Sequence, residues 1–188
     1  FILDRLVEAG RLAERYGDQL IGLGAYAAIV GHKGLLLSRK LRIPVTTGSS
    51  YTIAVAIEAT LKASQAVGLN VAEATVAIIG ATGTIGRVCA HLMAQQAKHL
   101  ILVARNQQRL EDLTQSLANR AQASVVALAD VEAAITNADI VIVATNTPTA
   151  IIDVAKLKPG TVICDISRPR NVPEESTLLR QDVLVLDG

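Results

Sequence analysis

Apolar residues recur at two different spacings along this chain, and the change of spacing outlines its organisation. From residue 75 onward, short runs of apolar residues alternate with stretches in which apolar residues recur every three or four positions. The short runs predict buried strands, and the other stretches predict amphipathic helices. Strands are predicted over residues 75–80, 99–104, 123–127, 139–144, 161–165 and 182–186. Helices are predicted between them over residues 84–97, 107–120, 130–136, 149–156 and 173–180.

The alternation of strand and helix with short links predicts the fold class. Such links imply right-handed crossovers, which leave neighbouring strands parallel and cover both faces of the sheet with helices. Hydrophobic residues make up 51% of the chain, which suits a sheet that is buried on both faces. We therefore expect an α/β fold, a Rossmann-type doubly wound parallel sheet with the strand order 3-2-1-4-5-6.

The residues before this region predict a smaller unit. Residues 1–16 have apolar positions at helical spacing, and a longer helix is predicted over 51–67, where Gly68 supplies the C-cap. We place the domain boundary near residue 70. Residues 1–70 then form a partial α/β segment together with its connecting helix, and residues 71–188 form the domain in which strands and helices alternate.

The strongest local signal is the sequence V-A-I-I-G-A-T-G-T-I-G at residues 76–86. Its glycines have the G-x-x-G-x-x-G spacing, a variant of the dinucleotide-binding fingerprint between a strand and a helix. The first glycine permits a tight turn, the second lets a pyrophosphate approach the backbone at a helix N-terminus, and the third lets the helix pack on the strand. The cofactor-binding residues predicted here are Gly80, Thr82, Gly83, Thr84, Ile85 and Gly86. The alternative is an ordinary glycine turn.

The end of the second predicted strand favours one of the two nicotinamide cofactors. Enzymes that use NAD usually place Asp or Glu there to bind the ribose 2′-hydroxyl. Here the strand is followed by R-N-Q-Q-R at residues 105–109, and the first carboxylate is Glu111. The planar guanidinium groups of Arg105 and Arg109 match the geometry of a 2′-phosphate. We therefore predict NADP(H), bound by Arg105, Asn106 and Arg109; the alternative is that both arginines are solvated surface residues.

Two further loops follow predicted strands at their carboxyl ends, where a parallel sheet places its ligands. Thr145, Asn146 and Thr147 follow the fourth strand, and we expect them to line the nicotinamide-ribose side of the cofactor. Residues 165–170, D-I-S-R-P-R, follow the fifth strand and are expected to face the reacting end of the cofactor. For each loop, the alternative is an ordinary strand-to-helix turn with a capping Asn or Ser.

Three segments together resemble a known family: V-T-T-G-S-S-Y-T at residues 45–52, G-A-T-G-T-I-G at 80–86 and L-V-A-R-N-Q-Q-R-L at 102–110. The set is similar to the long-chain acyl-[acyl-carrier-protein] reductases and the predicted amino acid dehydrogenases, and more distantly to the shikimate dehydrogenase group. The resemblance implies NADPH-dependent reduction of an acyl thioester on acyl carrier protein to an aldehyde, through an acyl–cysteine intermediate. That family's cysteine lies beyond the nucleotide domain. We therefore expect the nucleophile outside this chain, which begins with Phe1 and is expected to be a fragment.

The catalytic candidates within the chain are weak ones. Cys89 and Cys164 lie in apolar patterns and are expected to be structural thiols. Lys33 is the lysine available for a shikimate dehydrogenase-like reaction, although the polar loop around Thr47 lacks the aspartate that those enzymes pair with it. The hydroxyls of Thr47 and Ser49 are candidates to hold a substrate carbonyl or the carboxamide. All three tyrosines precede the glycine loop, which excludes the Tyr-x-x-x-Lys mechanism of short-chain dehydrogenases.

Composition and charge argue against several classes of function. Aromatic residues make up 2% of the chain and the net charge is +1, so we expect no nucleic-acid partner. We also expect no membrane span and no metal site, because no apolar run is long enough and no ligand cluster has the spacing. Two cysteines without a C-x-x-C motif indicate a reduced, cytoplasmic protein. Three functions stay open: an acyl-ACP reductase-like enzyme, a shikimate dehydrogenase-like oxidoreductase acting on a small-molecule hydroxy or amino acid, and a non-catalytic NADP(H)-binding module.

Overall fold

The computed structural model describes residues 1–28, 30–119 and 121–188. The chain forms two compact units, Phe1–Thr52 and Ile53–Gly188. This division falls earlier than the boundary predicted near residue 70. The reason is helix α4 (Ser49–Ala66), from which Ala56 and Ile57 are buried in the core of the second unit. Most of the helix expected to connect the two parts is therefore part of the second unit.

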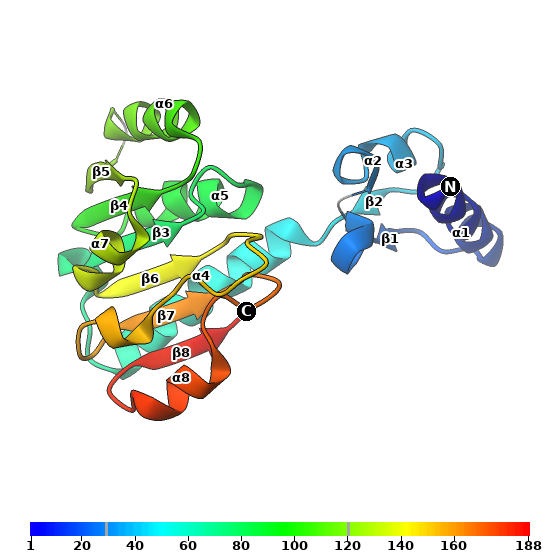
Figure 1. Cartoon of the computed structure of the whole chain (residues 1–188). Helices are drawn as coiled ribbons and strands as arrows, with labels where there is room; N and C mark the ends of the chain where they lie inside the picture. Colours follow the sequence, from blue (N-terminus) through cyan, green and yellow to red (C-terminus); the bar gives the residue numbers. More distant parts are fainter. Residues whose placement is uncertain (29, 120) are drawn as a thin grey trace. The chain divides into compact units, whose positions relative to one another are not determined.

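In the described part of the chain, the second unit is built on a six-stranded sheet (Figure 1). The strands are β3 (Thr75–Ile79), β4 (His99–Val103), β5 (Ser124–Leu128), β6 (Ile140–Val143), β7 (Val162–Asp165) and β8 (Leu184–Asp187). Every neighbouring pair is parallel, and the order across the sheet is β5-β4-β3-β6-β7-β8. Counted from β3, this is the predicted order 3-2-1-4-5-6, so the Rossmann-type fold class is confirmed.

Helices bury both faces of this sheet. They are α4, α5 (Thr84–Met93) and α6 (Gln107–Ala118) on one face, and α7 (Val131–Thr136) with the 3-10 turn η3 (Val154–Lys156) on the other. The 3-10 turn η2 (Val71–Glu73) precedes β3, and α8 (Glu174–Leu179), whose Leu178 and Leu179 are exposed, connects β7 to β8. Successive side chains of a strand point to opposite faces. Ile78 and Leu102 accordingly pack with α4, α5 and α6, whereas Ile79 and Val143 pack with α7 and η3. Burial on both sides explains why the strands read as continuous apolar runs.

The helix predicted over residues 149–156 is wrong, because only the 3-10 turn η3 forms, at the C-terminal end of this range. The backbone N–H of Ile152 donates to the carbonyl oxygen of Asn171 (3.2 Å) instead of to a helical partner. The chain therefore runs alongside the loop that follows β7. A turn begins only at Asp153, whose side chain accepts a hydrogen bond from the N–H of Ala155 (3.0 Å).

The first unit has a small core of its own. Its elements are α1 (Ile2–Tyr16), β1 (Ile21–Gly22), η1 (Ala25–Ala28), α2 (Val30–Lys33), α3 (Leu35–Ser38) and β2 (Val45–Thr46). Strands β1 and β2 are parallel, and Val7, Leu23 and Leu37 form the buried core. Among the described residues of both units, no helix combines the length and the apolar character that crossing a bilayer requires.

Candidate functional site

Two glycines set the turn between β3 and α5. Gly80 has a φ of 85°, and a Cβ there would lie 2.5 Å from the carbonyl oxygen of Ala144. A Cβ at Gly86 would lie 2.3 Å from the carbonyl oxygen of Gly80. Both distances are far below ordinary van der Waals contact, so a side chain at either position would displace the backbone beside it. The turn and the close approach of helix to strand therefore depend on these two glycines.

Gly83 has a different role, because it is the exposed N-cap of α5. A Cβ there would lie 3.2 Å from the carbonyl oxygen of Gly80, a tight fit rather than a clash. The N–H groups of the first helical turn point out of this helix end, where the helix dipole favours an anion. The site fits the pyrophosphate of a dinucleotide, because a side chain at Gly83 would fill the space above the turn. Beside it, Thr82 and Ile85 are half-buried and Thr84 is exposed.

The loop after β4 starts next to the glycine turn. The N–H of Gly80 donates to the carbonyl oxygen of Val103 (2.9 Å), the last residue of β4. Arg105 follows two residues later, and both Arg105 and Arg109 are exposed. Asn106 has a local structural role, since its Oδ1 accepts a hydrogen bond from the N–H of Arg109 (2.9 Å) and caps α6. The loop thus begins at the glycine turn, and Asn106 orients the helix that carries Arg109.

The loop after β6 joins the same edge of the sheet. The hydroxyl oxygens of Thr145 and Thr147 are 2.8 Å apart, and both residues are half-buried, whereas Asn146 is exposed. The N–H of Thr145 donates to Oγ of Ser167 (3.3 Å) in the loop after β7. The loops after β3, β6 and β7 are therefore contiguous. They meet where the strand order reverses between β3 and β6, the position at which doubly wound sheets bind their ligands.

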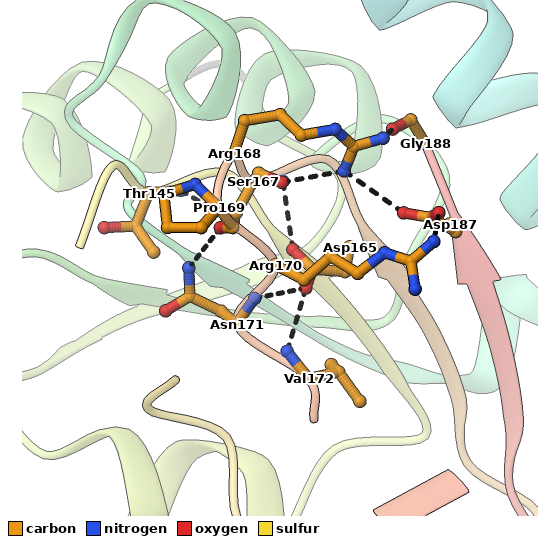
Figure 2. Close-up of polar contacts among 10 residues, drawn as sticks. All are labelled: Thr145, Asp165, Ser167, Arg168, Pro169, Arg170, Asn171, Val172, Asp187 and Gly188. Carbon is orange, nitrogen blue, oxygen red and sulfur yellow. Dashed lines mark hydrogen bonds and ion pairs between the residues drawn. The ribbon is translucent and has the colours of Figure 1, made fainter. Parts of the chain in front are cut away.

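A buried carboxylate organises the loop after β7 (Figure 2). Asp165 is 2% exposed and accepts hydrogen bonds from three backbone N–H groups. The donors are Ser167 (2.9 Å), Asn171 (2.6 Å) and Val172 (2.9 Å). Hydrogen bonds that several backbone N–H groups donate to one carboxylate fix the path of a loop. The aspartate that the sequence placed in a cofactor-facing loop thus shapes that loop.

Figure 2 also shows two arginines of this loop on one carboxylate. Arg168 and Arg170 both form ion pairs with Asp187 at the end of β8, and Arg168 donates to the carbonyl oxygen of Ser167 (2.8 Å) as well. The two guanidinium groups are therefore engaged in joining the loop to the edge strand. An open hollow of about 300 Å³ lies beside this contact, lined by Asp165, Arg170, Val172, Val183, Val185, Leu186 and Asp187.

The residue that the sequence reasoning missed is Asn171. Its side chain is fully buried, and its Nδ2 donates to the carbonyl oxygen of Pro169 (3.2 Å). Its Oδ1 is buried without a hydrogen-bond partner, the one such side-chain atom in the described part of the chain. Leaving a buried acceptor unsatisfied costs about 1–3 kcal/mol, so this oxygen marks a place for a donor from a ligand or a water molecule. The available signal was an asparagine directly after the polar loop.

The catalytic candidates of the first unit lie near one another. The hydroxyl oxygens of Thr47 and Ser49 are 3.1 Å apart. A Cβ on Gly34 would lie 3.8 Å from Cγ2 of Thr47, so the turn that contains Lys33 packs beside this loop. Lys33 is exposed and has a φ of 59°, a left-handed conformation that costs a side-chain-bearing residue about 1–2 kcal/mol. These three residues therefore belong to one neighbourhood of the first unit.

Both cysteines are buried thiols. Burial raises the pKa of Cys89 to about 11, and the neighbouring Cys164 contributes to the rise. Burial also raises the pKa of Cys164, although a hydrogen bond with Thr60 of α4 acts in the opposite direction. Neither side chain is a thiolate near neutral pH, so neither has the reactivity of a nucleophilic cysteine. Among the residues that the structure describes, no three His, Cys, Asp or Glu side chains are grouped to hold a metal ion.

The fold and the glycine turn define the class of protein. The second unit is an oxidoreductase-type NAD(P)-binding domain, built on a doubly wound parallel sheet with a glycine turn after β3. Comparison with known proteins gives the family: the chain belongs to the shikimate / quinate 5-dehydrogenase family, which matches residues 61–187. The matched region starts within α4 and contains the whole sheet, so it lies within the second unit.

Individual relatives are distant. The chain is 29% identical over 188 residues to the aminotransferase PigE of Serratia sp., covering 100% of this chain and 22% of that protein. It is 31% identical over 194 residues to the long-chain acyl-[acyl-carrier-protein] reductase of Synechococcus elongatus, covering 98% of this chain and 54% of that protein. The chain thus spans about half or less of the length of these relatives. The second match confirms the predicted resemblance to the acyl-ACP reductases.

Among solved structures, the fold matches the Δ1-pyrroline-2-carboxylate reductase of Thermococcus litoralis, which was solved in complex with NADH and L-proline. The TM-score is 0.57 at 14% identity, and the match covers 74% of this chain and 44% of that one. At this identity the likeness supports the fold alone.

Proposed function

We propose that this chain is the NADP(H)-binding part of a reductase that converts an acyl thioester, carried on acyl carrier protein, into an aldehyde. The observation that carries the choice of cofactor is the end of β4. Two exposed arginines, Arg105 and Arg109, follow this strand beside the glycine turn, and the first carboxylate comes only at Glu111. The similarity to the acyl-ACP reductase of Synechococcus elongatus supports the thioester substrate.

Each loop at this edge of the sheet then has one task. The N-terminus of α5 holds the pyrophosphate above Gly83, and Arg105 with Arg109 holds the 2′-phosphate. Thr145 and Thr147, with the exposed Asn146 between them, line the nicotinamide-ribose side. A bound nicotinamide would supply the hydride. The acyl group would first pass to a cysteine thiolate, so that the carrier leaves as a thiol, and the hydride would then add to the carbonyl carbon of the acyl–cysteine and release the aldehyde and the cysteine thiolate.

The remaining polar groups orient the reactants. Thr47 and Ser49, whose hydroxyl oxygens are 3.1 Å apart in the first unit, are groups of the kind that hold a carbonyl oxygen, and Lys33 is the lysine that the shikimate dehydrogenase-like alternative would use. The two buried thiols leave the acyl-accepting nucleophile to a residue outside 1–188. The cytoplasmic location stays a prediction that rests on these reduced thiols.

The test is a turnover assay with long-chain acyl-ACP, run on a protein in which residues 1–188 are joined to the segment that supplies the acyl-accepting nucleophile. Residues 1–188 alone are the control, and we expect them to bind NADPH and to form no aldehyde. NADPH consumption is followed by absorbance and the aldehyde product by mass spectrometry, with NADH and the corresponding free fatty acid as controls. We expect aldehyde formation with acyl-ACP and NADPH, slower formation with NADH, and none from the free acid. Reduction of NADP by a small hydroxy acid, with no aldehyde from acyl-ACP, would instead establish the shikimate dehydrogenase-like alternative. Cofactor binding without turnover of either substrate class would establish the binding module.

A further inference from the structure

The first unit carries a cationic hollow that none of the roles above uses. It lies between α1 and the segment that follows α3, and its volume is about 850 Å³. One isoleucine and six charged residues line it: Glu8, Arg11, Glu14, Arg15, Lys40 and Arg42. The four cationic residues are exposed, and within the described part of the chain none of them forms an ion pair. The lining therefore carries four positive and two negative charges, a net charge of +2.

The two acidic residues of the hollow are already engaged. Glu8 forms an ion pair with Arg5 (3.0 Å), which lies outside the hollow. Glu14 accepts hydrogen bonds from the backbone N–H groups of Arg42 and Ile43. Both carboxylates thus have other partners. Arg11 and Arg15 lie one helical turn apart on α1, and neither forms an ion pair with Glu8 or Glu14.

The walls of the hollow are held in place at two points. One is Glu14, whose carboxylate ties the backbone of residues 42 and 43 to α1. The other is Gly10, where a Cβ would lie 2.4 Å from Cδ1 of Leu41, so the leucine packs directly on the helix backbone. Because the backbone of both walls is fixed, the hollow that carries the cationic side chains exists before a ligand binds.

The distribution of charge along the chain points the same way. Residues 1–52 contain seven Lys and Arg against four Asp and Glu, a net charge of +3. Residues 53–188 contain eleven Lys and Arg against thirteen Asp and Glu, a net charge of −2. The small first unit therefore carries the positive field of the chain, and such a field attracts an acidic partner from a distance.

We propose that this hollow docks the acidic surface of the carrier protein that presents the acyl thioester. The identity of the partner rests on the proposed function, whereas the position of the docking site rests on the charges of the hollow. A protein partner is favoured over a nucleic acid by the lining, in which the described residues include no aromatic side chain to stack on a base.

The test is binding of holo acyl carrier protein, without an acyl group, to the full chain by fluorescence anisotropy. The variant Arg11→Glu/Arg15→Glu reverses two charges of the hollow, and Lys62→Glu/Lys98→Glu makes the same change of charge at two exposed lysines outside it. We expect the first variant to raise Kd at least tenfold, equivalent to 1.4 kcal/mol. The second is expected to stay within about twofold of wild type, and wild-type binding is expected to weaken as salt shortens the Debye length. Circular dichroism checks that both variants are folded.

Unchanged binding by the Arg11→Glu/Arg15→Glu variant would overturn the proposal, as would equal losses in both variants. A single-stranded RNA oligonucleotide that binds more tightly than the carrier, and loses binding only in the hollow variant, would overturn it in favour of a nucleic-acid partner. Turnover separates this inference from the proposed function. Binding through the hollow without thioester reduction leaves the docking site standing and refutes the reductase, whereas reduction without an effect of the hollow variant refutes the docking site alone.

Discussion

Replacing Gly83 by alanine separates cofactor binding from folding. The new Cβ would lie 3.2 Å from the carbonyl oxygen of Gly80 and 3.7 Å from that of Ala144, so small shifts accommodate it. It would, however, stand over the N-terminus of α5, where the pyrophosphate has to approach the backbone. The matched change at Gly86 has the opposite character, because its Cβ would lie 2.3 Å from the carbonyl oxygen of Gly80.

The magnitudes follow from these distances. Gly83→Ala places alanine at an N-cap, which costs about 1 kcal/mol of the free energy of unfolding. Gly86→Ala forces a backbone overlap of the overpacking kind, with a cost of about 2–3 kcal/mol. For binding, we expect Gly83→Ala to weaken NADPH at least tenfold, which corresponds to about 1.4 kcal/mol. Gly22→Ala is the control, since a Cβ there meets nothing within 4 Å.

The assay pairs calorimetric titration of NADPH with urea denaturation of each variant. The expected pattern is lost binding with a small stability change for Gly83→Ala, a large stability loss for Gly86→Ala, and neither effect for Gly22→Ala. A folded Gly83→Ala variant that binds NADPH with wild-type affinity would refute the reasoning, because the cofactor would then not lie across this turn.

Three further predictions concern single side chains. Arg105→Ala should abolish a preference for NADPH over NADH of about tenfold or more, and equal affinities in the wild type would disprove the role of the arginines. Asp165→Asn should lower the free energy of unfolding by about 1–3 kcal/mol, because an amide nitrogen would then face a backbone N–H donor. Asp112→Asn on the exposed face of α6 is the control, and equal urea midpoints for the two variants would contradict the prediction. Burial raises the pKa of Cys89 from 9.0 to about 11, so the thiol loses its proton at lower pH in the unfolded chain than in the folded one. The contribution to the free energy of unfolding is therefore full below about pH 9 and falls by up to about 1.4 kcal/mol per pH unit towards pH 11. Cys89→Ala should reduce this decline when urea denaturation is measured as a function of pH.

The sheet was predictable because its physics is local. Each strand is buried on both faces and therefore reads as a continuous apolar run, as in residues 76–79 and 140–143. The order of the strands followed from one further signal, the glycine turn after β3, in which a Cβ at Gly80 or Gly86 would clash with backbone atoms, as their predicted roles in the turn and in helix packing imply. Helix α4 was recognisable from its length and from Gly68, which has the left-handed φ of 75° that a C-cap requires.

The features that escaped prediction depend on contacts between residues distant in sequence. The loss of the helix over 149–156 follows from the hydrogen bond of Ile152 to Asn171, and no local pattern records that contact. The same holds for the unpartnered Oδ1 of Asn171, since burial of a polar side chain is a property of the folded loop. The cationic hollow requires Glu14 and Arg42 to meet across 28 residues. The role of Asn106 as the cap of α6 was local, but a cap and a ligand-binding residue have the same sequence signature.

The most direct test of the account is a crystal structure of the full chain with NADPH. The account predicts the pyrophosphate above Gly83 at the N-terminus of α5, the 2′-phosphate within hydrogen-bond distance of Arg105, and the nicotinamide between the loop at Thr145 and the loop at Asn171. NADPH bound elsewhere, or a cofactor whose 2′-phosphate contacts neither Arg105 nor Arg109, would contradict it.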